Sequence, residues 1–339
     1  MFLILNNNNS FIQIIYRIIM QFSLEICQHE NNLFSAAINS KNELMNKYFW
    51  LRDNYYIYLA LNSASKLKII KAFQKITDYN KKLKKFDYPP STDSEHIHPV
   101  YNENLEEITG EWAFVQNDSA GNMLEILSEA KDKYRADLII RYLATIEFWN
   151  CPDSGFWEEG KELRSSSLAA CLRGLESYEN NFGDNKKTRE MLNKGYKSLK
   201  NLLPNETPAR SSDIALLSLI YPDKLNHSII TRDLKQKIIE NVMPLVGEYG
   251  VKRYLGDKWD GIDWSLGEEK EMQWTMGLPW LYLCTGQKEY FEKAREIRIK
   301  YRTMPEGIVD GKPNCTSCLL WSEAIYRIAE KKFRALLQF

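Results

Sequence analysis

Residues 55–73 read YYIYLALNSASKLKIIKAF, and their apolar side chains recur at the spacing of one face of an α-helix. The apolar positions are Ile57, Ala60, Leu61, Ala64, Leu67 and Ile70. Such a stripe predicts one helix that buries a single side against a core. Asp53 precedes the stripe and is placed to cap its first turn with the carboxylate.

Apolar stripes of the same kind follow along most of the chain. They cover residues 118–127, 138–146, 168–175, 214–219, 234–245, 280–284, 290–301 and 319–328. Ser165, Ser166 and Ser167 are placed to cap the helix over 168–175, and Gly174 within it predicts close packing. No linker divides the stripes, so residues 23–339 are predicted to form a single all-α domain.

Signals for strands and for membrane segments are weak. The turn-forming dipeptides Asp260-Gly261 and Asp310-Gly311 lack β-branched flanks, so neither predicts a hairpin. Residues 1–22 combine an asparagine run with a short apolar run, which is too interrupted to span a bilayer and lacks the basic front of a signal peptide. We expect a loosely attached extension there, no membrane association and a cytoplasmic protein.

Composition argues against several classes of partner. Among the 339 residues, Lys plus Arg number 45 and Asp plus Glu also number 45, so no net charge recruits nucleic acid or acidic lipid. The six cysteines have no regular spacing, and Cys315 and Cys318 form a lone CxxC without a second pair. His96 and His98 are more typical of a loop than of a metal site. We therefore expect no metal or cofactor, and the sequence predicts no particular oligomeric state.

The pentapeptide Gly155-Phe156-Trp157-Glu158-Glu159 carries the clearest chemical signal. Aromatic neighbours lower the local dielectric around a carboxyl group, and an adjacent carboxylate adds repulsion, so the pKa of one glutamate rises. A carboxylic acid that stays protonated near neutral pH is what cleavage of a glycosidic bond requires. The alternative is that both aromatics fill a core and both glutamates are solvated.

A series of motifs in fixed order carries a resemblance to a known family. They are Trp50-Leu51-Arg52-Asp53, Trp112 with Gln116-Asn117-Asp118, the pentapeptide 155–159, Gly250-Val251-Lys252-Arg253-Tyr254, Gln273-Trp274 with Pro279-Trp280, Pro305-Glu306, and Leu320-Trp321-Ser322. Over about residues 35–328 the chain resembles glycoside hydrolase family 15, the glucoamylase-like clan. This clan also includes the N-terminal domain of the phosphorylase kinase regulatory α and β subunits.

The resemblance implies a fold and a catalytic pair. The fold would be an (α/α)6 toroid, in which an outer ring of helices surrounds an inner one and a pocket opens at one end. Glu158 would be the general acid that protonates the leaving oxygen, and Glu306 the general base that activates water. In the hydrolases Gln or Tyr commonly follows the base, whereas Gly307 follows it here, and a turn with a solvated glutamate is the alternative for Glu306.

The resemblance also implies a sugar site. Arg52 and Asp53 would hold hydroxyls of a terminal glucose, and Arg253 and Glu159 would make further sugar contacts. Trp112, Trp157 and Trp280 would supply walls and stacking surfaces.

The implied activity is that of an inverting, exo-acting hydrolase, which releases glucose from the non-reducing end of an α-linked oligo- or polysaccharide. Hydrolysis of trehalose or of dextran-type linkages is an alternative within the same class. A second alternative is a glycan-binding or regulatory protein that keeps the toroid without turnover. An interaction scaffold with no sugar role is a third.

Overall fold

The computed structural model describes residues 23–84, 88–108, 113–226, 228–257, 259 and 271–337. Helices dominate this part of the chain, and the predicted extension at 1–22 lies outside it. None of the helices within these ranges is long and apolar enough to cross a membrane.

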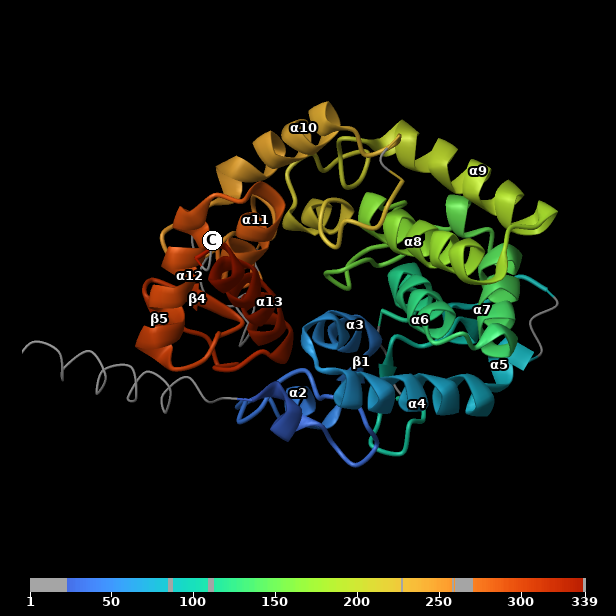
Figure 1. Cartoon of the computed structure of the whole chain (residues 1–339), viewed down its shortest axis with the longest axis horizontal. Coiled ribbons are helices and arrows are strands. Elements are labelled where there is room, and N and C mark those ends of the chain that lie inside the picture. The colour runs from blue at the N-terminus through green and yellow to red at the C-terminus, as the bar shows by residue number, and fades with distance from the viewer. Residues whose placement is uncertain are drawn as a thin grey trace, which may run out of the picture.

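The main helices form two concentric rings (Figure 1). The inner ring consists of α3 (Leu51–Ala60), α6 (Asn117–Glu129), α8 (Ser165–Phe182), the 3-10 helix η4 (Ile214–Leu219), α11 (Gly277–Thr285) and α13 (Leu320–Leu336). Each packs against the next, and α13 packs against α3, which closes the ring. The outer helices alternate with them in sequence and are α4 (Ser63–Tyr79), α7 (Lys133–Thr145), α9 (Lys186–Leu202), α10 (Arg232–Val242) and α12 (Lys288–Tyr301). The prediction of an all-α toroid is confirmed.

Short elements complete the described chain. The helical ones are η1 (Leu24–Cys27), α2 (Glu43–Lys47), α5 (Lys81–Lys84), η2 (Asp93–Glu95), η3 (Phe148–Asn150) and η5 (Met243–Leu245). The strands β1 (Phe49–Trp50) and β2 (Val100–Tyr101) form an antiparallel pair. The strands β3 (Gln273–Trp274), β4 (Gly307–Val309) and β5 (Lys312–Pro313) form an antiparallel sheet in that order.

The single helix predicted over 55–73 is in fact two helices. Helix α3 ends at Ala60, and α4 begins at Ser63 after Asn62, whose side chain accepts a hydrogen bond from the Ser65 amide. Leu67, predicted to lie on the buried face, is 58% exposed. The periodicity misled because α3 belongs to the inner ring and is buried on nearly all sides, so it has no polar face to mark its end.

The caps predicted for two helices are also wrong. Trp50 occupies the N-cap position of α3, and Asp53 lies inside the first turn. Arg164 occupies the N-cap of α8 without a capping side chain, and the serines that follow it form the first turn. Ser165 Oγ donates to the Asn205 carbonyl at 2.6 Å, so a tertiary partner has replaced the local one.

A hairpin forms where none was predicted. Asp310 and Gly311 join β4 to β5, with φ of 50° and 71°. Two consecutive positive φ angles are those of the tight two-residue turn that suits antiparallel strands, and an Asp-Gly pair adopts them readily. Turn geometry therefore outweighed the missing β-branched flanks. The other dipeptide, Asp260-Gly261, lies outside the described residues.

Close packing at Gly174 is confirmed. A Cβ atom at this position would lie 2.5 Å from the carbonyl oxygen of Gly121 on α6, and one at Gly121 would lie 2.5 Å from the carbonyl carbon of Ala170. The two inner helices therefore approach backbone to backbone, which only glycine allows.

We predict that Gly174→Ala lowers the free energy of unfolding by about 1–3 kcal/mol, because α6 and α8 must separate to admit the methyl group. This loss exceeds the gain of about 1 kcal/mol in helix propensity. Urea unfolding measures the effect. Asn180→Ala, at an exposed position of α8, is the control and should stay within about 0.5 kcal/mol of the native protein.

Candidate active site

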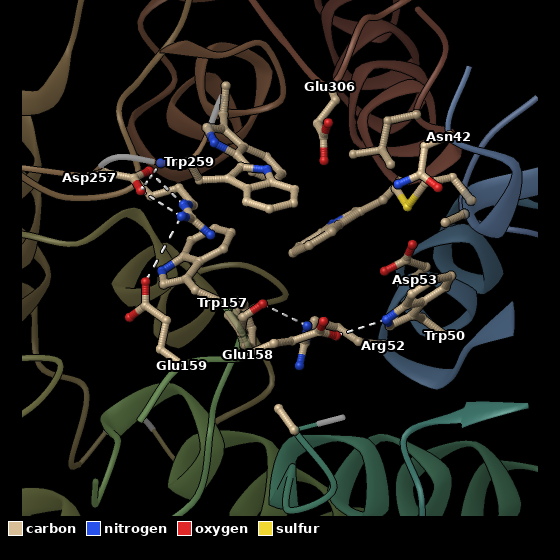
Figure 2. Close-up of a pocket in the computed structure, with 18 of the residues that line it drawn as sticks. Asn42, Trp50, Arg52, Asp53, Trp157, Glu158, Glu159, Asp257, Trp259 and Glu306 are labelled. Atoms are coloured by element: carbon tan, nitrogen blue, oxygen red, sulfur yellow. Dashed lines mark hydrogen bonds and ion pairs between the residues drawn. The ribbon is translucent and has the colours of Figure 1, made fainter. Parts of the chain in front are cut away.

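One cavity of about 660 Å³ opens at the end of the ring where the inner helices begin. Figure 2 shows side chains that line it. Consecutive inner helices run parallel because each outer helix returns the chain to the same end, so their N-termini gather there. The lining includes Asn42, Leu44, Met45, Trp50, Arg52, Asp53, Ala113, Phe156, Trp157, Glu158, Glu159, Arg253, Tyr254, Asp257, Trp259, Trp274, Glu306, Leu319 and Trp321. Helices remote in sequence thus contribute to a single site.

Most of the predicted site residues border this cavity. They are Arg52, Asp53, Trp157, Glu158, Glu159, Arg253 and Glu306. Trp280 does not, because its ring is fully buried behind Phe156 and its indole nitrogen donates to the Tyr221 carbonyl at 3.2 Å. The prediction that Trp280 forms a wall of the pocket is therefore wrong. Trp112 lies outside the described residues.

Glu158 lies in the loop between η3 and α8, with a φ of 59° that is uncommon outside glycine. Its Oε1 accepts hydrogen bonds from Trp50 Nε1 at 2.8 Å and from Gln116 Nε2 at 3.3 Å. Burial raises the pKa of Glu158, although the charge of Arg52 and these hydrogen bonds oppose the shift. The side chain is half-buried because it borders the cavity.

Arg52 holds this loop in place. Its buried guanidinium donates to Asp118 Oδ2 at 2.7 Å and to the carbonyl oxygens of Phe156 at 2.8 Å and Gly155 at 2.9 Å. It also donates to the side chain of Gln116. The guanidinium has five N–H donors in all, so most of them bind protein groups rather than a ligand. Arg52 thus connects the start of α3 to the start of α6 and to the pentapeptide.

Asp53 differs from its neighbour because its carboxylate faces the cavity. It is 6% exposed, and within the described ranges no hydrogen bond reaches it. Burial raises the pKa of Asp53 to about 7, against the charge of Arg52, and the charges of Glu158 and Glu306 raise it further. An acceptor this deep without a donor is suited to binding a hydroxyl group of a ligand.

Glu306 precedes β4 and is 4% exposed. Its carboxylate accepts hydrogen bonds from the side chains of Asn314, Thr316 and Trp259. Burial raises the pKa of Glu306 to about 7, although these hydrogen bonds and the charge of Arg253 oppose the rise. A solvated glutamate in a turn, the alternative raised by the sequence, does not describe this buried side chain.

Glu159 has the opposite electrostatic environment to Glu158. Burial alone would raise the pKa of Glu159, but hydrogen bonds from Tyr254 and Arg210 and the charges of Arg210 and Arg253 hold it below its ordinary value. Arg210 Nη2 donates to Glu159 Oε2 at 2.8 Å, and its guanidinium lies 3.6 Å from the centre of the Tyr254 ring. Two adjacent glutamates therefore favour different protonation states.

The wall around Trp157 is built from packed aromatic rings and a buried ion pair. Trp157 Nε1 donates to Asp213 Oδ1 at 2.9 Å, and its ring centroid lies 5.3 Å from that of Trp274. The Arg253 guanidinium lies 5.2 Å from the centre of the Trp157 ring and donates to Asp257 at 2.6 and 2.5 Å. Flat rings beside hydrogen-bonding groups are suited to a sugar.

Sequence reasoning missed several residues that line or support the cavity. Trp50, Trp274 and Trp321 lie within the quoted motifs, so a signal for them was present. Asn314 belongs to none of the motifs and meets Glu306 only through the hairpin. In the described part of the chain, no group of three or more His, Cys, Asp or Glu side chains is placed to hold a metal ion.

Comparisons with known proteins agree with this arrangement. A glycosidase structure covers 92% of this chain and 94% of its own, with 16% sequence identity and a TM-score of 0.74. The glucoamylase of Saccharomycopsis fibuligera matches over 91% of this chain and 90% of its own, with 12% identity and a TM-score of 0.67. A glycosidase variant in complex with glucose covers 92% and 94%, with 15% identity and a TM-score of 0.69. A search of curated protein sequences found no match.

The helical toroid of this chain, with its pocket at one end, is thus similar to the folds of these glycosidases and of the glucoamylase. The model of glycosyl hydrolases family 15 matches residues 15–259, which is more than half of the chain. The protein belongs to this family, as the sequence motifs predicted, and its substrate is a glycan.

We predict that Asp53→Asn makes the protein more stable at pH 8 and leaves its stability nearly unchanged at pH 3.5. The pKa of Asp53 is about 7 in the folded protein and near 3.8 in the unfolded chain, so the folded protein binds the proton more tightly. The stabilisation that results is fully present below pH 3.8, and it is lost as the pH rises through about 7. The asparagine side chain is never charged, so the free energy of unfolding should exceed that of the native protein by about 2–4 kcal/mol at pH 8.

Urea unfolding at both pH values tests this expectation, with Glu103→Gln at an exposed position as the control. Equal stabilisation at the two pH values would show that the gain does not come from the buried charge.

Proposed function

We propose that this protein is an inverting, exo-acting glycoside hydrolase that releases glucose from the non-reducing end of α-glucans or short α-glucosides. The observation that carries the proposal is that Glu158 and Glu306, from distant parts of the chain, border the same cavity. Figure 2 shows them on opposite sides of it, with Asp53 between them at the side. An inverting pair needs this arrangement, because the bond and the attacking water both lie between the carboxyl groups.

In the proposed reaction Glu158 is the general acid. Its proton passes to the glycosidic oxygen as the bond from that oxygen to the anomeric carbon breaks. The raised pKa of Glu158 supports the role, because the carboxyl group must be protonated when substrate binds. Arg52 supports it indirectly by holding two backbone carbonyls of the loop that carries the acid.

Glu306 is the proposed general base. A water molecule beside it attacks the anomeric carbon from the face opposite the leaving oxygen, and Glu306 accepts the proton that the water loses. The products are glucose with inverted anomeric configuration and a shortened glycan. Glu306 acts in its ionised form, so its raised pKa lowers activity at acidic pH.

Asp53 is the proposed acceptor for hydroxyls of the terminal sugar, since its carboxylate faces the cavity and no described group donates to it. Trp157 and Arg253 form one wall of the same pocket, and Glu159 lies beside them. The cavity of about 660 Å³ has a volume typical of pockets that hold a small ligand, which agrees with binding of a terminal sugar. The glycosidase variant with bound glucose supports glucose as the sugar.

We predict that Glu158→Gln lowers glucose release from maltotriose by at least about 10²–10⁴-fold, because the amide cannot donate the required proton. Binding of maltotriose, measured by calorimetry, should remain close to that of the native protein. Full activity in this variant would show that Glu158 is not the acid.

We predict that Glu306→Gln lowers glucose release from maltotriose by a similar factor, because the amide cannot accept a proton from water. The same assay measures it.

Proton NMR of the first product should show β-glucose from an α-linked substrate. Release of α-glucose would contradict inversion.

A panel of maltose, maltotriose, trehalose and isomaltotriose separates the alternative linkages. If the native protein binds these sugars and hydrolyses none of them, the non-catalytic glycan-binding alternative is correct.

A further inference from the structure

The hairpin between β4 and β5 places a second segment directly beside Glu306. The turn at Asp310 and Gly311 pairs Val309 with Lys312 and Ile308 with Pro313. The pairing continues beyond the strands, since the Asn314 amide donates to the Gly307 carbonyl at 3.0 Å. The hairpin register therefore brings Asn314 beside the proposed base.

A second backbone contact continues the same alignment. The Glu306 amide donates to the Thr316 carbonyl at 3.0 Å, and the Glu306 carbonyl accepts from the Thr275 amide at 3.2 Å. The backbone of Glu306 is thus held from two sides. Gly307 allows this packing, because a Cβ atom there would lie 2.4 Å from Met272 Cγ.

The side chain of Asn314 acts on the carboxylate itself. Asn314 is 8% exposed, and its Nδ2 donates to Glu306 Oε2. Its Oδ1 is buried and has no hydrogen-bond partner among the described residues. Burying an unsatisfied amide oxygen costs free energy, so the orientation of this amide is not explained by its own hydrogen-bonding needs. It is explained by the donor that the carboxylate receives.

We propose that Asn314 is a positioning residue for the hydrolytic reaction, which aims the Glu306 carboxylate into the cavity and favours its ionised form. The inference rests on the proposed role of Glu306 as the base. The side chain of Thr316 donates to the same carboxylate and also contacts Ser40 Oγ at 3.1 Å, so it assists from the adjacent position.

Other charged and titratable groups also face Glu306. Arg253 and the side chain of Trp259 lie on the segment before α11 and favour the carboxylate, whereas Asp53 on α3 repels it. Cys315, next to Asn314, has its own pKa raised first by burial and then by the charge of Glu306. A change at Asn314 leaves these groups in place, so its effect on Glu306 can be measured separately.

The test compares kcat/KM for maltotriose between pH 5 and pH 9 in the native protein, Asn314→Ala and Asn314→Asp. Loss of a donor to the carboxylate raises the pKa of Glu306. If this pKa is higher by about 1, the ionised fraction of Glu306 is about tenfold lower at pH values below the pKa. At pH 6 we expect the kcat/KM of Asn314→Ala to be about one-tenth of that of the native protein. At pH 9 the two proteins should have nearly equal kcat/KM. Asn314→Asp adds a repelling carboxylate, so its loss at pH 6 should be larger.

The matched control is Lys312→Ala, at an exposed position of the same hairpin, which should follow the native pH profile. A purely structural role for Asn314 would lower activity by the same factor at every pH, and that result would overturn the proposal. An unchanged profile would overturn it as well.

Carbon-13 NMR titration of the glutamate carboxyl groups gives a readout without substrate, with Glu306→Gln used to assign the signal. A higher titration midpoint for Glu306 in Asn314→Ala supports the proposal, and an unchanged midpoint contradicts it. Full hydrolytic activity in Glu306→Gln would instead show that Glu306 is not the base. That result would contradict the proposed function and not the contact between Asn314 and Glu306.

Discussion

The buried guanidinium of Arg52 connects the parts of this protein that must meet at the cavity. It donates to Asp118 at the start of α6 and to two carbonyls of the loop that carries Glu158. A buried charge is tolerated only when it is paired and its donors are satisfied, and both conditions are met here by groups from α6 and from the loop before α8. The geometry of the proposed acid thus depends on the packing of α3 against α6. The sugar contact that the family resemblance implies for Arg52 stays a prediction, and in the structure most of its donors bind protein groups.

The cavity concentrates carboxylic acids in a place where they are costly to ionise. Asp53 and Glu306 both have a pKa raised to about 7 by burial, and the pKa of Glu158 is raised as well. The gathered N-termini of the inner helices supply partial positive charge that favours anions, but this does not offset the loss of water. A site of this kind lowers the stability of the fold at neutral pH and in exchange holds groups that can transfer protons there.

The two glutamates of the pentapeptide show how neighbours in sequence become chemically distinct. Glu158 turns toward Trp50 and the cavity, and its backbone has a left-handed conformation. Glu159 turns toward Arg210 and Tyr254, which keep it ionised. The aromatic-acidic string correctly indicated that one carboxyl group would have a raised pKa. The string alone did not indicate which partners would give the two glutamates different pKa values.

The sequence by itself determined the helical class, the order of the helices and the family, because helical periodicity and motif order are local properties of the chain. It also indicated the loops that carry Glu158 and Glu306. Tertiary structure decided which side chains face the cavity, because that depends on how each helix is rotated within the ring. Trp280 points into the core while Trp321 lines the pocket, although both lie on inner helices. Asn314 reaches Glu306 only through the register of a hairpin, and such a contact has no signature in the local sequence.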